Sequence, residues 1–224
     1  MKKRLTDQLA TYLKKEGIEQ SFAITGAGSV RIIESFKDAN IKINYFHHEQ
    51  AAVMASIGYT KLSGKTGVVI VTGGPGAINS VTGIASAQLD SIPVIILGGQ
   101  EKAEYYKSYK DLRAYGVQGL DMVSITKPIT KSSFAVKNEK DIRNITKVIN
   151  EAEVGRKGPV WIDLPQDIQW LQVSELNNHT KKISNKSYDI REVVEALKNS
   201  KKPLLWIGYG VRSSGASELT SDFL

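Results

Sequence analysis

Residues 67–76 read Gly-Val-Val-Ile-Val-Thr-Gly-Gly-Pro-Gly, and this stretch decides the fold. Its first six residues form a nearly continuous apolar run, which is typical of a strand covered by protein on both faces. The glycines and the proline predict a sharp turn into a helix that continues to about Leu89. A second apolar run, Pro-Val-Ile-Ile-Leu at 93–97, follows and predicts another buried strand.

The same alternation extends in both directions from this stretch. Further strands are expected at 21–25, 41–46, 134–136 and 160–164. Further helices are expected at 5–13, 29–38, 49–62 and 139–154. Residues 101–121 have no clear period and predict a long surface loop. Strands that alternate with helices indicate an α/β fold with an open parallel sheet and helices on both faces.

The polar stretch Glu-Leu-Asn-Asn-His-Thr-Lys-Lys-Ile-Ser-Asn-Lys-Ser at 175–187 interrupts this pattern and predicts an interdomain linker. We expect a first domain over 1–172, a linker over 173–188 and a further segment over 189–224. That segment predicts one helix at 190–199 and one strand at 203–208. A single pair of this kind is smaller than a stable domain of about 50 residues. We therefore expect 189–224 to be the truncated start of a second α/β domain.

Composition excludes several classes of protein. The chain has 224 residues, 41% of them hydrophobic, and no cysteine, which excludes disulfides and thiolate metal sites. No run of about 18 apolar residues predicts a membrane helix, and no secretory signal pattern begins the chain. We therefore expect a cytoplasmic protein without a membrane partner.

The charge balance is basic. Thirty Lys and Arg against 23 Asp and Glu give a net charge of +7. Such a balance can indicate an anionic partner, including nucleic acid. The basic residues form no stripe and match no nucleic-acid motif, so we expect a solvated surface and no nucleic-acid partner.

Two glycine loops join predicted strands to predicted helices. Gly26-Ala27-Gly28 begins like a dinucleotide-binding fingerprint, but Arg31 stands where the third glycine is needed, so a tight turn is the better interpretation. Residues 73–79 (Gly-Gly-Pro-Gly-Ala-Ile-Asn) lack the lysine of a phosphate-binding P-loop. Spacing alone leaves two interpretations of this second loop open: turn geometry, or close approach of a ligand.

His47-His48-Glu49-Gln50 lies where a predicted strand meets a predicted helix. The spacing of a helical zinc motif is absent, because Val53 stands where the second histidine is needed. Taken alone, Glu49 is best explained as an acidic residue favoured by the positive end of the helix dipole. We expect no metal site in this chain.

Four segments, in the order in which they occur along the chain, resemble those of a known family. The segments are YFHHEQAAVMASIGYTKLSGK at 45–65, GVVIVTGGPGAINSVTGIASAQLDSIPVIILGGQ at 67–100, DMVSITKPITK at 121–131 and GPVWIDLPQD at 158–167. Over residues 3–170 the chain closely resembles the N-terminal pyrimidine-binding (PYR) domain of thiamine-diphosphate enzymes of the acetolactate synthase group.

The resemblance implies a catalytic role for Glu49. In the family, thiamine diphosphate lies between the PYR domain of one subunit and the diphosphate-binding domain of another. The glutamate at the position of Glu49 bonds N1′ of the aminopyrimidine and shares a proton with it. This proton relay makes the 4′-imino nitrogen the base for C2 of the thiazolium, and the cofactor then attacks and decarboxylates a 2-keto acid such as pyruvate.

The resemblance also assigns further residues. Beside the pyrimidine it places Glu49 and the second glycine loop: Gly74, Pro75, Gly76 and Asn79. On the substrate side it places Ala27, Gly28, His48, Gln100 and Gln118.

Part of the family's machinery is missing from these residues. The diphosphate-binding domain holds Mg²⁺ through a Gly-Asp-Gly segment, which does not occur in the 224 residues. We therefore expect a fragment of a longer enzyme, inactive alone and dimeric or tetrameric when complete. The alternative is a non-catalytic PYR-type subunit that pairs with a separate diphosphate-binding partner. FAD, used by some members of the family, is possible and undecided.

Overall fold

The computed structural model describes residues 2–107, 112–176 and 188–224. The chain divides into two compact units, Met1–Ile183 and Ser184–Leu224, and each is described by itself. Residues 177–187, which hold most of the expected linker, lie outside the described residues.

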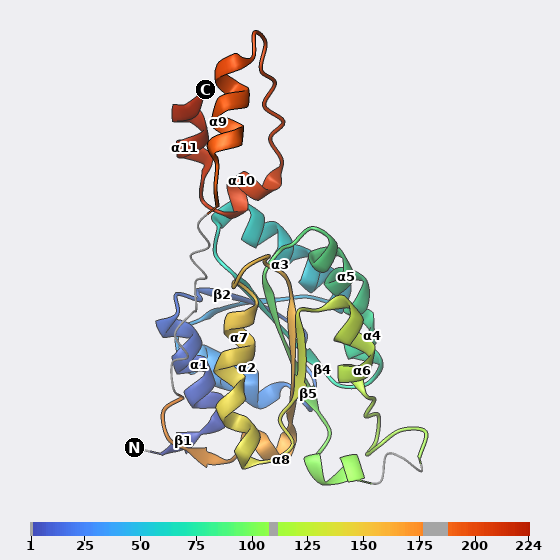
Figure 1. Ribbon diagram of the computed structural model, residues 1–224. Coiled ribbons are helices and arrows are strands. Elements are labelled where there is room, and N and C mark those ends of the chain that lie inside the picture. Colours follow the sequence, from blue (N-terminus) through green and yellow to red (C-terminus); the bar gives the residue numbers. More distant parts are fainter. Residues whose placement is uncertain (1, 108–111, 177–187) are drawn as a thin grey trace. The chain divides into compact units, whose positions relative to one another are not determined.

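The first unit is built on a six-stranded parallel sheet (Figure 1). In sheet order its strands are β3 (Lys42–Tyr45), β2 (Gln20–Ala23), β4 (Gly67–Thr72), β5 (Val94–Gln100), β7 (Val160–Pro165) and β6 (Ser132–Ala135). A two-stranded antiparallel sheet pairs β1 (Lys3–Arg4) with β8 (Gln172–Val173). The expected open parallel α/β sheet is confirmed.

Helices cover both faces of the main sheet. The α-helices of this unit are α1 (Leu5–Lys15), α2 (Val30–Asp38), α3 (Glu49–Ser63), α4 (Pro75–Asn79), α5 (Val81–Leu89), α6 (Met122–Thr126), α7 (Ile145–Glu151) and α8 (Gln166–Gln169). Short 3₁₀ helices are η1 (Ala103–Lys107), η3 (Lys127–Ile129) and η4 (Glu139–Asn144). Helices α1, α2 and α7 contribute to one apolar cluster, and α3, α5 and α6 to the other.

The alternation along each central strand explains these two layers. Val68 and Ile70 of β4 belong to the first cluster, whereas Val69 and Val71 belong to the second. All four side chains are fully buried. Successive side chains of a strand point to opposite faces, so a strand covered on both faces has no polar alternation. The apolar run that predicted this strand follows from that geometry.

The boundary of the first unit differs from the expected one. Val173 pairs with Lys3 across the small sheet, and Leu176 is packed into the first apolar cluster. The unit therefore continues at least to Leu176, beyond the boundary expected at residue 172. Two-residue strands carry no periodicity, so the sequence could not reveal this pairing.

The second unit contains α9 (Arg191–Asn199), α10 (Tyr209–Ser213) and α11 (Ser217–Phe223). The strand expected at 203–208 is wrong, because the described residues of this unit contain no strand. A strand needs a partner for its backbone hydrogen bonds, and none is present there. Trp206 is 92% exposed, and no described residue from 188 to 224 is buried.

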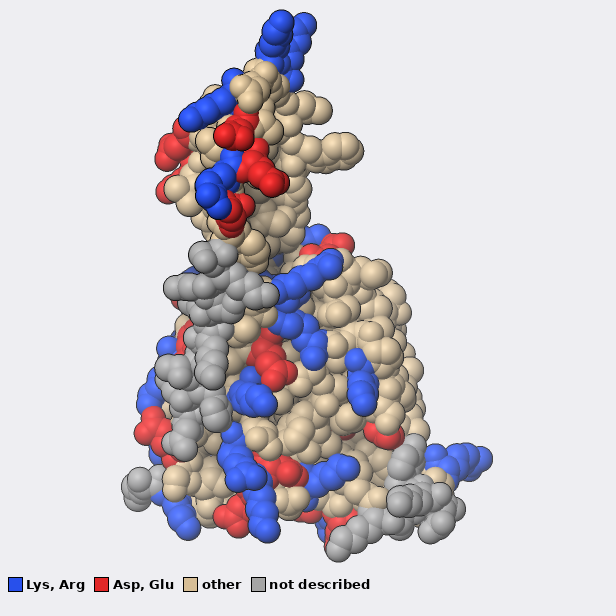
Figure 2. All heavy atoms as spheres, in the orientation of Figure 1, with Lys and Arg blue, Asp and Glu red and all other residues tan. Residues whose placement is uncertain are grey.

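Charged side chains are spread over the first unit. Lys and Arg atoms alternate with Asp and Glu atoms on the face drawn in Figure 2 and do not form one stripe. Several of these side chains form salt bridges with neighbours in space, such as Lys61 with Asp90 and Lys65 with Glu19, both at 2.7 Å. In the part of the chain that the structure describes, no helix has the length and apolar character needed to cross a membrane.

Candidate functional site

The strand order places a topological switch point between β2 and β4. After β2 the chain moves outward to β3, and β4 then returns to the other side of β2. In open α/β sheets, ligands bind in the crevice at the carboxyl ends of strands at such a point. The loop after β2 lies close to the end of β4 there, because a methyl group on Gly26 would lie 2.7 Å from Cβ of Thr72, the last residue of β4.

Glu49 enters this region from the start of α3. His48 is the N-cap of the helix, and its Nδ1 accepts a hydrogen bond of 3.2 Å from the backbone N–H of Gln50. Glu49 is therefore the first residue of the helix, and it is buried at 7% exposure. The exposed side chain of His48 serves as a helix cap in this structure, and a contact with substrate stays a prediction.

Helix α4, which follows β4, contacts the two carboxylate oxygens of Glu49 through two different residues. Nδ2 of Asn79 donates to Oε2 of Glu49 at 3.0 Å. A methyl group on Gly76 would lie 2.8 Å from Oε1. The structure thus brings together Glu49, Gly76 and Asn79, which the sequence assigned to one site. Oε2 is occupied by an amide, whereas Oε1 lies against a residue without a side chain.

Gly74 and Gln118 are also brought together. Gly74 has φ of 72°, a left-handed conformation that glycine adopts without steric cost. A methyl group there would lie 2.3 Å from the carbonyl oxygen of Gln118. Nε2 of Gln118 donates to the carbonyl of Gly73 at 3.3 Å. The expected long loop therefore returns to the glycine loop at Gln118, while Pro75 is exposed at the start of α4.

The loop after β2 is held against the end of β5. A methyl group on Gly28 would lie 2.4 Å from the carbonyl oxygen of Gly99, so the two backbones touch. Nε2 of Gln169 fixes the same turn by donating to the carbonyl of Gly28 at 2.8 Å. Gly28 is buried by this packing, and Ala27 is the exposed residue of the turn.

Gln100 lies deeper than a substrate-side residue was expected to lie. It is only 1% exposed, and its Nε2 donates to the carbonyl of Leu120 at 3.1 Å. Its Oε1 accepts from the backbone N–H of Glu101 at 3.2 Å. In this structure Gln100 supports the segment that carries Gln118, and a substrate contact by Gln100 stays a prediction.

Sequence reasoning missed a buried acid near this site. Asp163 lies on β7 at 1% exposure, and its Oδ1 accepts a hydrogen bond of 2.9 Å from Nε1 of Trp161. Burial raises the pKa of Asp163 to about 7, and the hydrogen bond from Trp161 acts in the opposite direction by favouring ionisation. The available signal was an acidic residue in the middle of the apolar strand Val-Trp-Ile-Asp-Leu.

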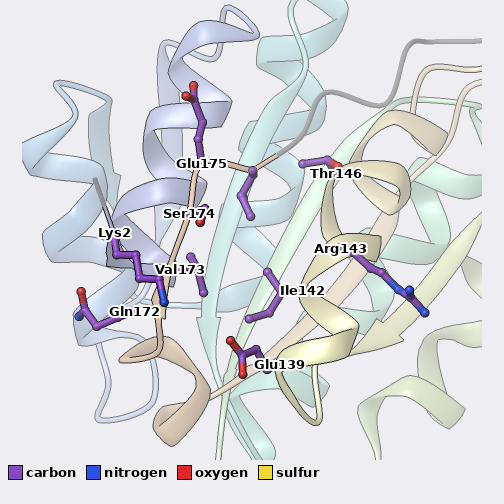
Figure 3. A pocket seen from close by; sticks show the side chains of 10 residues that line it. Lys2, Glu139, Ile142, Arg143, Thr146, Gln172, Val173, Ser174 and Glu175 are labelled. Atoms are coloured by element: carbon purple, nitrogen blue, oxygen red, sulfur yellow. The ribbon is translucent and has the colours of Figure 1, made fainter.

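A separate groove lies between the start of the chain, the segment after α8, and the 3₁₀ helix η4 with the first turn of α7 (Figure 3). It encloses about 280 Å³ and is lined by Lys2, Glu139, Ile142, Arg143, Thr146, Gln172, Val173, Ser174, Glu175 and Leu176. None of these residues is among those assigned to the site from the sequence.

The structure thus places a buried carboxylate against a bare glycine at a topological switch point. Residues 3–125 match the family model described as thiamine pyrophosphate enzyme, N-terminal TPP binding domain. The chain belongs to this family. The match covers β1 to α6 and therefore includes Glu49 and the glycine loop.

Curated relatives agree with this assignment. An acetolactate synthase large subunit of Lactococcus lactis is 38% identical over 221 residues. An acetolactate synthase isozyme 2 large subunit of Escherichia coli and a chloroplastic acetolactate synthase of Arabidopsis thaliana are each 33% identical. These alignments cover 95%, 95% and 93% of this chain but 37%, 38% and 32% of the relatives. The chain thus spans about a third of the length of the relatives that it matches.

Proposed function

We infer that this chain supplies the pyrimidine-binding half of a thiamine diphosphate site, with Glu49 as the catalytic residue. The observation that carries this proposal is the pairing of Glu49 with Asn79 and Gly76. Family membership supplies the cofactor class, and the partly exposed Gly76 leaves space beside Oε1 of Glu49 that a flat ring can approach.

The roles of the side chains follow from their geometry. Asn79 donates to Oε2 and so fixes the carboxylate plane, which leaves Oε1 as the atom that holds or releases a proton. Gly76 gives a ring access to Oε1, because any side chain there would collide with it. Bound thiamine diphosphate would supply the electron sink for decarboxylation of a 2-keto acid.

The activity of the complete protein extends this proposal. The relatives are named acetolactate synthases, so we propose decarboxylation of a 2-keto acid such as pyruvate, followed by carboligation. Residues outside this chain would hold the diphosphate and Mg²⁺ in a dimer or tetramer, and FAD would also bind mainly outside it. We further propose a cytoplasmic location and the domain division into a PYR domain, a linker and the start of a central domain.

Replacing Glu49 by Gln in the complete enzyme tests the proposal. The amide keeps the shape of the side chain but cannot carry the proton, so we expect turnover to fall by about 10²- to 10⁴-fold, the usual contribution of a general acid or base. Steady-state turnover of pyruvate, with cofactor binding followed in parallel, measures the effect.

Glu19→Gln is the matched control, because Glu19 is an exposed residue that pairs only with Lys65 in the described structure. This variant should retain normal turnover. Unchanged turnover in Glu49→Gln would remove the catalytic assignment and favour a non-catalytic module.

A further inference from the structure

Helix α8 connects the ends of two strands that are not neighbours in the sheet. It follows β7 directly, and β4 and β5 lie between β7 and β2. Its last residue, Gln169, is only 1% exposed. Nε2 of Gln169 donates to the carbonyl of Leu164 in β7 and to the carbonyl of Gly28 in the turn after β2, both at 2.8 Å. One buried amide therefore joins the two strand ends.

The carbonyl of Gly28 lies in a closely packed place. A methyl group on Gly99 of β5 would lie 2.1 Å from this oxygen, so the turn is pressed against the β5 backbone. Gly28 and Gly99 are both buried. A buried backbone carbonyl without a donor is energetically unfavourable. The amide of Gln169 supplies that donor and so stabilises the turn in this position.

Other contacts hold α8 independently of the Gln169 amide. Oδ1 of Asp167 accepts a hydrogen bond of 2.9 Å from the backbone N–H of Ala103, at the start of η1. At the surface, the guanidinium carbon of Arg31 lies 4.1 Å from the ring centroid of Trp170. The amide can therefore be removed by substitution while these contacts remain.

The turn that Gln169 holds lies next to the Glu49 site. A methyl group on Gly26 would lie 2.9 Å from Cγ2 of Thr72, and a methyl group on Gly76 would lie 3.2 Å from the same atom. The methyl group on Gly76 would also lie 2.8 Å from Oε1 of Glu49. The side chain of Thr72 thus borders both the turn and the glycine beside the carboxylate.

We propose that Gln169 is a positioning residue that holds residues 26–29 at the substrate side of the site and thereby sets the affinity for the 2-keto acid. Its amide fixes the place of Ala27, the exposed residue of the turn. Without that donor the turn shifts, whereas Glu49 keeps its hydrogen bond from Asn79 on α4. The effect on substrate affinity rests on the proposed function, and the link between Gln169 and the turn does not.

Gln169→Met tests the link, because methionine has a similar length and no hydrogen-bond donor. The backbone N–H groups of Ser29 and Val30 donate to the carbonyl of Gly26, so their hydrogen exchange reports the turn. In the complete protein we expect exchange at these two groups to be about tenfold faster, the loss of about one hydrogen bond. Exchange in β4 should stay as in wild type. Unchanged exchange in the turn would overturn the proposal.

Steady-state kinetics with pyruvate test the effect on substrate. A loss of this size corresponds to about tenfold in affinity, so KM for pyruvate should rise by about that factor while kcat changes less. A merely destabilised variant would contain less active enzyme, which lowers kcat and leaves KM unchanged. That result, or an unchanged KM with normal kcat, would overturn the proposal.

Gln172→Met is the matched control, because it makes the same replacement nearby at an exposed side chain. The amide of Gln172 donates only a long hydrogen bond of 3.5 Å, to the carbonyl of Trp170. Exchange at residues 29–30 and KM for pyruvate should both stay as in wild type. Equal effects in Gln172→Met and Gln169→Met would overturn the assignment to Gln169.

Gln169→Asn serves where Gln169→Met does not fold. It keeps the amide but is one methylene shorter, so it cannot reach both carbonyls, and we expect smaller changes in the same directions. Its failure to change either measurement would also overturn the proposal. The two proposals fail separately, because exchange in the turn requires no cofactor: the link can be present while Glu49→Gln retains full turnover, and the reverse.

Discussion

Gly76 is the residue whose missing side chain leaves room beside the buried carboxylate of Glu49. A methyl group at Gly76 would lie 2.8 Å from Oε1 of Glu49 and 3.2 Å from Cγ2 of Thr72. Of these two neighbours, the Glu49 carboxylate could move more easily than Thr72, but the hydrogen bond from Asn79 to Oε2 restricts its movement. The glycine thus sets both the position of the acid and the space in front of it.

Gly76→Ala should therefore displace Glu49 while preserving the fold. A shift of about 1 Å in a catalytic group can lower the rate by about 10²-fold, and we expect a loss of that order in the complete enzyme. Gly58→Ala on the same helix as Glu49 is the control, because a methyl group there meets nothing within 4 Å. Normal turnover in Gly76→Ala would show that the carboxylate position is not critical.

At this scale the sequence predicted which residues would meet but not every role. Glu49, Gly76 and Asn79 come together as the motif implied. The sequence could not reveal that Gln100 would be buried, because its burial depends on residues 115–121 folding back across β5. The sequence around a glutamine at the end of a strand is the same whether its side chain faces solvent or is covered by another segment of the chain.

Helices α3 and α5 show how close packing positions the site at the scale of elements. Gly83 of α5 faces Val53 of α3, and a methyl group there would lie 2.6 Å from Cβ of Val53. Val53 is fully buried, so it has little room to move. The glycine lets the two helices approach, and this fixes α3, whose first residue is Glu49.

Gly83→Ala should destabilise the protein despite the better helix propensity of alanine. The propensity gain is about 1 kcal/mol, whereas overpacking a core costs about 1–3 kcal/mol. Denaturant unfolding measures the difference, and Val53→Ala in the same chain should recover part of it. Gly58→Ala, which is exposed and unobstructed, should be neutral or slightly stabilising. Destabilisation by Gly58→Ala as large as that by Gly83→Ala would contradict the packing argument.

The strands that the sequence predicted well are those that neighbouring strands and helices bury on both faces. β4 and β5 are predicted because both faces are buried, and their apolar runs report this directly. β8 was missed because two residues show no period. The strand expected at 203–208 did not form, since no residue in the described ranges pairs with this segment. Apolar runs predict burial, but strand formation also requires a neighbour.

At the scale of the whole molecule, the two units contribute unequally to stability. Every buried residue in the described ranges lies in the first unit, which contains both apolar clusters. Burial of apolar surface is the dominant favourable contribution to folding. Cooperative unfolding should therefore report the first unit, including the buried Asp163.

The pH dependence of stability follows from Asp163. Its pKa is raised from 3.8 to about 7 by burial, so between these values the folded state holds a proton that the unfolded chain has released. This contribution to stability is complete below about pH 4 and is lost as pH rises through about 7. At about 1.4 kcal/mol for each pKa unit, this contribution to the free energy of unfolding reaches at most about 4 kcal/mol.

Denaturant unfolding from about pH 5 to pH 8 should show the free energy of unfolding falling in wild type. The fall should be smaller in Asp163→Asn, because an amide binds no proton in either state. Asp90→Asn should retain the wild-type slope, and equal slopes in all three proteins would mean that Asp163 does not titrate in this range.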